Sequence, residues 1–208
     1  MKGVRTLDLT DSDQILSIRP IRADDGPRLQ TLMQSMSDES RYYRFMDAIR
    51  ELPAPLLKYF VEVDFDFDMA LVAVVDLGTE RENIVAVARY FGDDDGLGCE
   101  FALAVADAWH HHGIGHRLMQ ELFECARSHG YQHMHGDVLA DNAHMLHLMQ
   151  HLGFRLRTSP EDPGLKLVER RLDALNISPF SPPLHAADAQ PRDEVAADQP
   201  EFRANPCS

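Results

Sequence analysis

Cysteine, basic residues and long apolar runs are all scarce in this sequence, and each shortage argues against a class of protein. Its 208 residues hold three cysteines, Cys99, Cys125 and Cys207, and no CxxC pair, which disfavours a disulfide framework or a cysteine zinc site. The most hydrophobic stretches, such as 69–75 and 101–106, are far too short to span a bilayer. The N-terminal segment is polar and lacks the apolar core of a signal peptide, so we expect a soluble, cytoplasmic protein.

The charge balance disfavours two kinds of partner. Lysine and arginine number 20 against 34 aspartates and glutamates, which gives a formal net charge of -14. Such a field repels phosphate backbones and anionic lipid, so neither a nucleic acid nor a membrane surface is an expected partner. Cationic partners, such as lysine-rich peptides or polyamines, would be attracted instead.

Proline marks a change of composition near the end of the sequence. Six of the 12 prolines follow residue 178, among Ala, Asp, Gln and Ser, where no helical or strand periodicity is present. This composition is typical of disorder. We therefore expect a polar lead at 1–13, one folded domain at 14–173, and a Pro/Ala/Asp-rich, disordered tail at 174–208.

Between these ends, helical and strand patterns are interleaved. Apolar residues three and four apart predict helices, and alternating or β-rich apolar runs predict about seven strands. This mixture predicts a single α/β or α+β domain. The helices are expected at 28–36, 37–49, 56–61, 113–128 and 143–152, and the strands at 15–21, 69–77, 84–91, 99–105, 133–139, 154–158 and 165–171.

A glycine pair lies where an expected strand leads into the helix at 113–128. Gly113 and Gly115 would let the main chain approach a ligand, and the free N–H groups of a helix N-terminus suit a pyrophosphate. Leu118 stands where a dinucleotide-binding fingerprint needs its third glycine, and no Gly-Lys-Ser/Thr follows for a P-loop. From spacing alone, a purely structural turn is the simpler interpretation, and phosphate binding stays open.

Neighbouring segments carry a family resemblance that covers about 18–172. The segment 99–119 resembles motif A of the GNAT superfamily of N-acetyltransferases, in which Arg/Gln-x-x-Gly-x-Gly/Ala follows a strand. The segment 142–154, which ends in Leu-Gly-Phe, resembles the next helix of that superfamily. Upstream, the chain resembles the acetyltransferase domain of bacterial Pat-type protein lysine acetyltransferases at 37–46, 70–73, 87–90 and 100–101.

The resemblance implies a fold and an activity. The fold is the α+β GNAT fold, a mixed and mostly antiparallel sheet of six to seven strands that splays between strands 4 and 5, with about four flanking helices. The activity is transfer of an acetyl group from acetyl-CoA, without a metal, to a primary amine acceptor, with a protein lysine preferred. A polyamine or aminoglycoside-like acceptor, or a non-catalytic acyl-CoA sensor, stays an alternative, and the oligomeric state, monomer or homodimer, stays open.

The resemblance also implies a cofactor site. The backbone at Val105 would pair with the pantetheine arm, and the loop before the long helix would hold the pyrophosphate. His110 stands where the family usually has Arg or Gln. This difference could weaken the affinity for the cofactor, but it need not harm a site that is built from backbone N–H donors. The implied cofactor-binding residues are Val105, His110, His111, His112, Gly113, Ile114, Gly115, His116, Arg117 and Asn142.

Acetyl transfer to an amine needs a base, because a lysine ε-amine has a pKa of about 10.4. Glu100, at the start of the strand before the glycine loop, matches the glutamate that the Pat-type family is thought to use. From the residues alone, a solvated carboxylate or a pair with Arg89 explains Glu100 as well. The oxyanion donor would be a backbone N–H near Val105. Met149 stands where many GNAT enzymes have an acidic tyrosine, so no general acid is assigned.

Two further clusters have competing interpretations. His144, His147 and His151 share a helix face and could chelate a metal, but no carboxylate or cysteine completes the set, so we prefer a solvated stripe. The acidic run 64–68 begins like a calcium loop, yet Met69 stands where that loop needs glycine. These aspartates form either an acidic rim near the acceptor cleft or an exposed edge.

Overall fold

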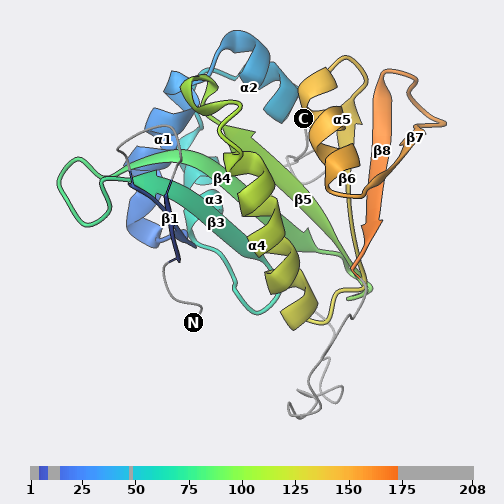
Figure 1. Cartoon of the computed structure of the whole chain (residues 1–208), viewed down its shortest axis with the longest axis horizontal. Helices are drawn as coiled ribbons and strands as arrows, with labels where there is room; N and C mark the ends of the chain where they lie inside the picture. Colours follow the sequence, from blue (N-terminus) through green and yellow to red (C-terminus); the bar gives the residue numbers. More distant parts are fainter. Residues whose placement is uncertain (1–4, 9–14, 47–48, 173–208) are drawn as a thin grey trace.

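A computed structural model describes residues 5–8, 15–46 and 49–172, and within them one mixed sheet runs through the molecule (Figure 1). Its eight strands have the order β1-β2-β3-β4-β5-β6-β8-β7. The strands are β1 Arg5–Asp8, β2 Ile15–Pro20, β3 Met69–Val75, β4 Asn83–Gly92, β5 Gly98–Val105, β6 His133–Leu139, β7 Arg155–Thr158 and β8 Leu165–Arg171. The helices are α1 Gly26–Ser35, α2 Asp38–Phe45, α3 Ala54–Val61, α4 Ile114–Ser128 and α5 Ala143–His151.

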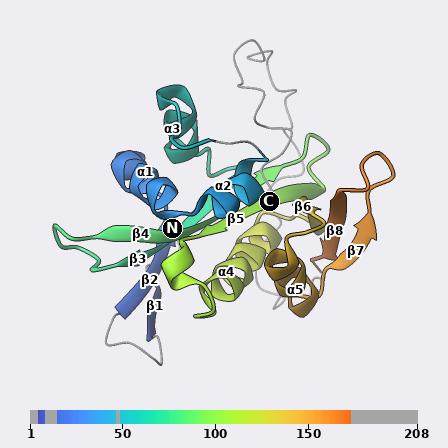
Figure 2. The ribbon, with the colours of Figure 1, turned by 90° about the horizontal axis from the view of Figure 1, so that it is seen from above.

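The helices form a layer on each side of the sheet. Figure 2 shows α1, α2 and α3 above it and α4 and α5 below it. Alternate residues of a strand point to opposite faces, and the central strand β3 is apolar on both. Val72 and Val74 pack in the cluster with α1 and α3, whereas Leu71 and Ala73 pack in the cluster with α4. We call these two sides the α1–α3 face and the α4–α5 face.

Strands β5 and β6 are paired at one end and diverge toward the other. They pair in parallel at three positions only, Gly98 with His133, Cys99 with Met134 and Glu100 with His135. Beyond these pairs β5 stays paired with β4, and β6 stays paired with β8. All other neighbouring strands are antiparallel. The predicted mostly antiparallel sheet, splayed between the fourth and fifth expected strands, is therefore confirmed.

The structure differs from the sequence-based expectation in a few places. The strand β1 adds an eighth strand within the segment expected to be a polar lead. The described residues hold five α-helices, as the apolar periodicity predicts, where the resemblance implies about four. The helix expected over 37–49 ends at Phe45, because Met46 takes a left-handed backbone conformation with φ 51°. The expected tail at 174–208 lies outside the described residues. No helix in the described part of the chain combines the length and the apolar character needed to cross a bilayer.

A buried ion cluster ties the start of α1 to the sheet. The Arg19 guanidinium donates to both carboxylate oxygens of Asp25, at 2.6 and 2.8 Å, and to Glu82 Oε1 at 2.6 Å. Burial by itself would raise the pKa of Asp25 and of Glu82. Both pKa values nevertheless lie below the usual range, because both carboxylates accept hydrogen bonds from Arg19 and Glu82 accepts another from the Gly78 N–H. The cluster thus stabilises the fold while both carboxylates are ionised.

We expect Arg19→Ala to lower the free energy of unfolding by roughly 3–5 kcal/mol, since two buried carboxylates would lose their counterion. Because their folded pKa values are depressed, this contribution is complete above about pH 4 and is lost as the pH falls through the folded values. Urea titrations at pH 7 and pH 3 test both points. The exposed pair Arg157–Glu169 is the control, and Arg157→Ala should cost less than about 1 kcal/mol. Equal losses in the two variants would contradict the expectation.

Candidate active site

The parting of β5 from β6 leaves main-chain groups of β5 facing a gap. In an antiparallel pair, the N–H and C=O of alternate residues point to the same neighbour. The Ala106 N–H donates to the Val85 carbonyl at 2.9 Å, so the main chain of Val105 points the other way, toward β6. There the Val105 carbonyl accepts a hydrogen bond from His110 Nε2 at 3.0 Å. The strand edge predicted to receive a pantetheine arm is thus an open edge that the imidazole of His110 caps.

The loop between β5 and α4 has an unusual backbone. His111 and Gly113 both have positive φ, 65° and 74°, and left-handed conformations at non-glycine residues concentrate at functional sites. No side chain caps the start of α4 in the described structure, so the first N–H groups of the helix face outward at its positive end. A Cβ at Gly115 would lie 3.3 Å from Leu103 Cδ2, so this glycine lets α4 approach β5 closely.

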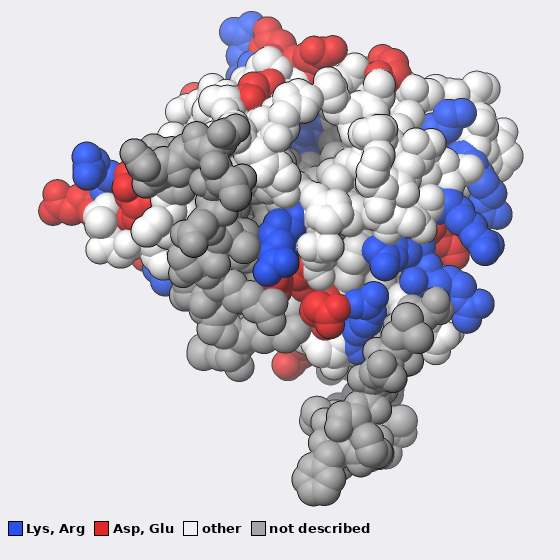
Figure 3. Space-filling view, viewed as in Figure 1, with Lys and Arg blue, Asp and Glu red and all other residues white. Residues whose placement is uncertain are grey.

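The surface is hollowed near the loop between β5 and α4. Figure 3 shows the hollow between α2 and α5, beside the start of α4, with a basic side chain visible inside it. A groove of ≈ 760 Å³ lies along α4 and the end of α5, and Arg117, Arg127 and Arg170 line it together with two glutamates. Anionic groups of a ligand would find positive charge on this side of the molecule.

Glu100 lies where the gap between β5 and β6 begins. It is half-buried and belongs to the last residue pair of the two strands, opposite His135. On its other side it is opposite Phe91 of β4. Residues opposite one another in a sheet share a face, so the three side chains lie together on the α1–α3 face.

An Asp–His pair that the sequence analysis did not single out lies next to Glu100. His135 Nε2 is 3.0 and 3.1 Å from the two carboxylate oxygens of Asp93, and His133 Nε2 is 4.0 Å from the nearer one. The Asp93 carboxylate can lie here only because residue 98 is glycine. A Cβ on Gly98 would lie 2.2 Å from the carboxylate oxygen. The signal in the sequence is the polar, alternating face of β6, on which His133, His135 and Asp137 are all titratable.

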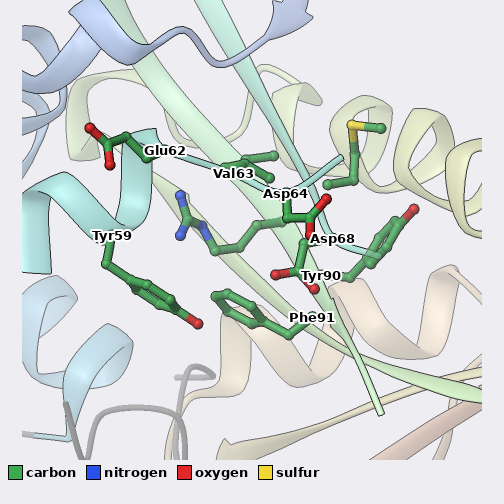
Figure 4. Close-up of a pocket in the computed structure, with 10 residues that line it drawn as sticks. Tyr59, Glu62, Val63, Asp64, Asp68, Tyr90 and Phe91 are labelled. Atoms are coloured by element: carbon green, nitrogen blue, oxygen red, sulfur yellow. The ribbon is translucent and has the colours of Figure 1, made fainter. Parts of the chain in front are cut away.

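A small cavity of ≈ 100 Å³ borders the same part of the sheet. Figure 4 shows its walls, in which the ring of Tyr59 stacks on Phe91 with centroids 5.9 Å apart. Three carboxylates, those of Glu62, Asp64 and Asp68, lie around it. The buried Arg89 also lines it, and burial together with the nearby Arg44 lowers its pKa to about 9.

Comparisons with known proteins agree with this geometry. Residues 32–154 match the model of the acetyltransferase (GNAT) family. The chain belongs to the GNAT family. It is 31% identical over 163 residues to the acetyltransferase PA5475 of Pseudomonas aeruginosa, across 78% of this chain and 87% of that protein.

Solved structures agree as well. The GNAT domain of S. lividans PAT superposes with a TM-score of 0.72 and 26% identity, across 81% of this chain and 96% of that one. The acetyltransferase yncA of Salmonella typhimurium, solved with acetyl-CoA, superposes with a TM-score of 0.62 and 18% identity, across 84% and 99%. The second likeness shows the fold, and the family membership makes this chain an acetyltransferase.

The remaining residues predicted to bind the cofactor in this GNAT chain differ in their positions and contacts. His112, Ile114 and His116 lie in the loop and the first turn of α4, as expected from the motif. Arg117 pairs with Glu121 one turn on, at 3.3 Å. Asn142 is buried and caps α5, since its Oδ1 accepts from the Met145 N–H at 3.1 Å, which explains this residue without a ligand.

Met149 and the three histidines His144, His147 and His151 of α5 take no part in the proposed chemistry. Met149 is fully buried, in the core, so its position supplies no proton donor. His144, His147 and His151 are exposed, as a solvated stripe requires, although His144 packs against His111 with ring centroids 5.2 Å apart. Among the described residues, no group of three or more His, Cys, Asp or Glu side chains has a metal-binding arrangement.

The close approach at Gly98 gives a test of this site. We expect Gly98→Ala to lower the free energy of unfolding by about 0.5–1.5 kcal/mol, because its Cβ would push aside the Asp93 carboxylate and the His133 imidazole, which lies 2.3 Å from the Cβ position, and so break the Asp93–His135 hydrogen bond. Thermal or urea unfolding measures the change. Gly26→Ala is the control, since its Cβ would make only an ordinary contact at 3.6 Å, and its cost should stay within about 0.5 kcal/mol. A Gly98→Ala protein as stable as the control would contradict the packing described.

Proposed function

We propose that this chain transfers the acetyl group of acetyl-CoA to a primary amine, and that the acceptor is the ε-amine of a lysine in a protein. The observation that carries the proposal is the position of Glu100 at the last pair of β5 and β6, where a carboxylate lies at the mouth of the gap. Family membership supports the acetyl transfer. The resemblance of the sequence to Pat-type protein lysine acetyltransferases supports a protein acceptor, and the fold is similar to that of the GNAT domain of S. lividans PAT.

The residues at the gap fit acetyl-CoA. When bound, this co-substrate supplies a thioester carbonyl that an amine can attack. The open edge at Val105 offers main-chain hydrogen bonds to an extended amide-containing arm, and His110 would have to release the Val105 carbonyl to admit it. The positive-φ loop at His111 and Gly113 and the uncapped start of α4 offer N–H groups to a diphosphate.

The carboxylate of Glu100 is the proposed general base. A lysine amine is protonated at neutral pH and must lose a proton before it can attack. Glu100 accepts this proton, directly or through a water molecule, and its half-buried position keeps it reachable from the α1–α3 face. The leaving thiolate needs no assigned acid, because a thiolate is a good leaving group.

The acidic cavity beside Phe91 supports a cationic acceptor. Its rim carries the carboxylates of Glu62, Asp64 and Asp68 against the single cation of Arg89, and Phe91 is opposite Glu100 on the neighbouring strand. A cationic side chain held against the Tyr59–Phe91 stack would also gain cation–π attraction. Of the two interpretations of the acidic run 64–68, we favour the rim of the acceptor site.

A thiol-release assay with acetyl-CoA and a panel of amines tests the acceptor class. We expect a lysine-rich peptide to be acetylated faster than spermidine or an aminoglycoside, with mass spectrometry locating the acetyl group on lysine. Faster turnover of a small amine would replace the protein acceptor by a small molecule. Binding of acetyl-CoA without consumption of any amine would favour a non-catalytic acyl-CoA sensor.

The same assay has a matched pair of variants on the acidic run. Asp64→Asn should raise the KM for the cationic peptide several-fold, because Asp64 lines the cavity. Asp66→Asn removes an equal charge from an exposed position that does not line it, so it should leave the KM nearly unchanged. Equal effects of the two would mean that only the overall charge attracts the acceptor.

The role of Glu100 is tested by Glu100→Gln. We expect kcat to fall roughly 100- to 10,000-fold, since the amide cannot accept the proton. The Kd for acetyl-CoA, measured by calorimetry, should change little because Glu100 lies away from the phosphate-binding loop. Glu80→Gln, at an exposed position between β3 and β4, is the control and should keep full turnover. Unchanged turnover in Glu100→Gln would remove Glu100 from the mechanism.

A further inference from the structure

The Asp93–His135 pair has the geometry of an oriented proton carrier. The Asp93 carboxylate can only accept hydrogen bonds when ionised, so His135 Nε2, at 3.0 and 3.1 Å from its two oxygens, carries the proton of the neutral imidazole. That tautomer leaves Nδ1 as a lone-pair acceptor. The side chain of His135 is 37% exposed, so a proton taken up at Nδ1 can be released to water.

The register of the sheet sets this imidazole beside the proposed base. Glu100 and His135 form the last pair of β5 and β6, on strands whose axes lie about 4.8 Å apart, and both side chains are on the α1–α3 face. At that spacing, two such side chains reach each other directly or through one water molecule. The neighbouring pair, Gly98 with His133, lies on the closed side, away from the gap.

We propose that His135, oriented by Asp93, carries the proton from Glu100 to solvent during acetyl transfer, an inference that rests on the proposed function. The acceptor ammonium gives one proton to the Glu100 carboxylate, which passes it to His135 Nδ1, and the resulting imidazolium releases it to water. The neutral amine nitrogen then forms the C–N bond as the C–S bond breaks, and the second amine proton ends on the leaving sulfur. His135 resets the base, and Asp93 is a positioning residue.

Charged groups face His135 from every neighbouring element. Asp93 and Asp95 approach from the β4–β5 turn, Glu100 from β5, and Glu169 from the opposite position on β8. On β6 itself the same face holds His133 on one side and Asp137 on the other, and burial raises the pKa of Asp137. Carboxylates therefore face the imidazole from three strands and one turn. The cationic side chains on the same face are His133, Arg171, which is opposite His133 on β8, and Arg157, which pairs with Glu169 at 3.0 Å.

The decisive experiment compares His135→Ala with His133→Ala in the thiol-release assay on the full chain, with acetyl-CoA and a lysine-rich peptide. We expect His135→Ala to lower kcat roughly 100-fold, with little change in the KM for acetyl-CoA, and added imidazole to restore part of the rate. His133→Ala, on the same strand face but outside the gap, should stay within about twofold of the parent kcat. Should His135→Ala fold poorly, His135→Gln serves the same comparison.

A second measurement does not depend on turnover. Long-range ¹H–¹⁵N spectra of the free protein should show neutral His135 as the Nε2–H tautomer, and Asp93→Ala should remove that preference. A parent-like kcat in His135→Ala, or a folded but inactive variant that imidazole does not rescue, would overturn the relay while leaving acetyl transfer intact. A parent protein that binds acetyl-CoA but acetylates no amine would overturn the proposed function, and the relay with it.

Discussion

The unequal pairing of β5 and β6 is the constraint on which the rest of the site depends. β5 pairs with β4 over seven positions and β6 pairs with β8 over seven, but the two strands share only three pairs with each other. Beyond Glu100 each strand therefore has one satisfied edge and one open edge. Unpaired backbone groups away from water are costly, so this edge needs a substitute partner, and His110 supplies one to Val105.

The open edge also separates two kinds of chemistry. Glu100 and His135 lie where the gap begins, whereas the loop at His111 and Gly113 lies beyond the other end of β5. Five residues of strand, at about 3.3 Å each, put roughly 17 Å between Glu100 and Val105. A ligand that reaches from one end to the other must be long and thin, with its anionic group at the helix and its reactive group at the carboxylate. This division follows from strand length alone, before any side chain is considered.

Periodic segments were predictable, and features that depend on register or on a single backbone angle were not. The apolar pattern of 113–128 predicted α4 within one residue, and the strands expected at 84–91 and 99–105 match β4 and β5 within one residue. The end of α2 depends on the left-handed Met46, which no pattern indicates. Asp93 and His135 are 42 positions apart in the chain, and only the register of β5 against β6 brings them together.

The formal charge of -14 averages over two sides that differ. On the α1–α3 face, three carboxylates and one arginine line the cavity beside Glu100. On the α4–α5 face, three arginines and two glutamates line the groove along α4, and Figure 3 shows further basic side chains gathered over β7 and β8. An anionic donor and a cationic acceptor would thus each approach the side that attracts it, and the sheet between them opens only where β5 and β6 part. Net charge alone, read from the sequence, favours a cationic acceptor but could not reveal a separate basic side for an anionic ligand.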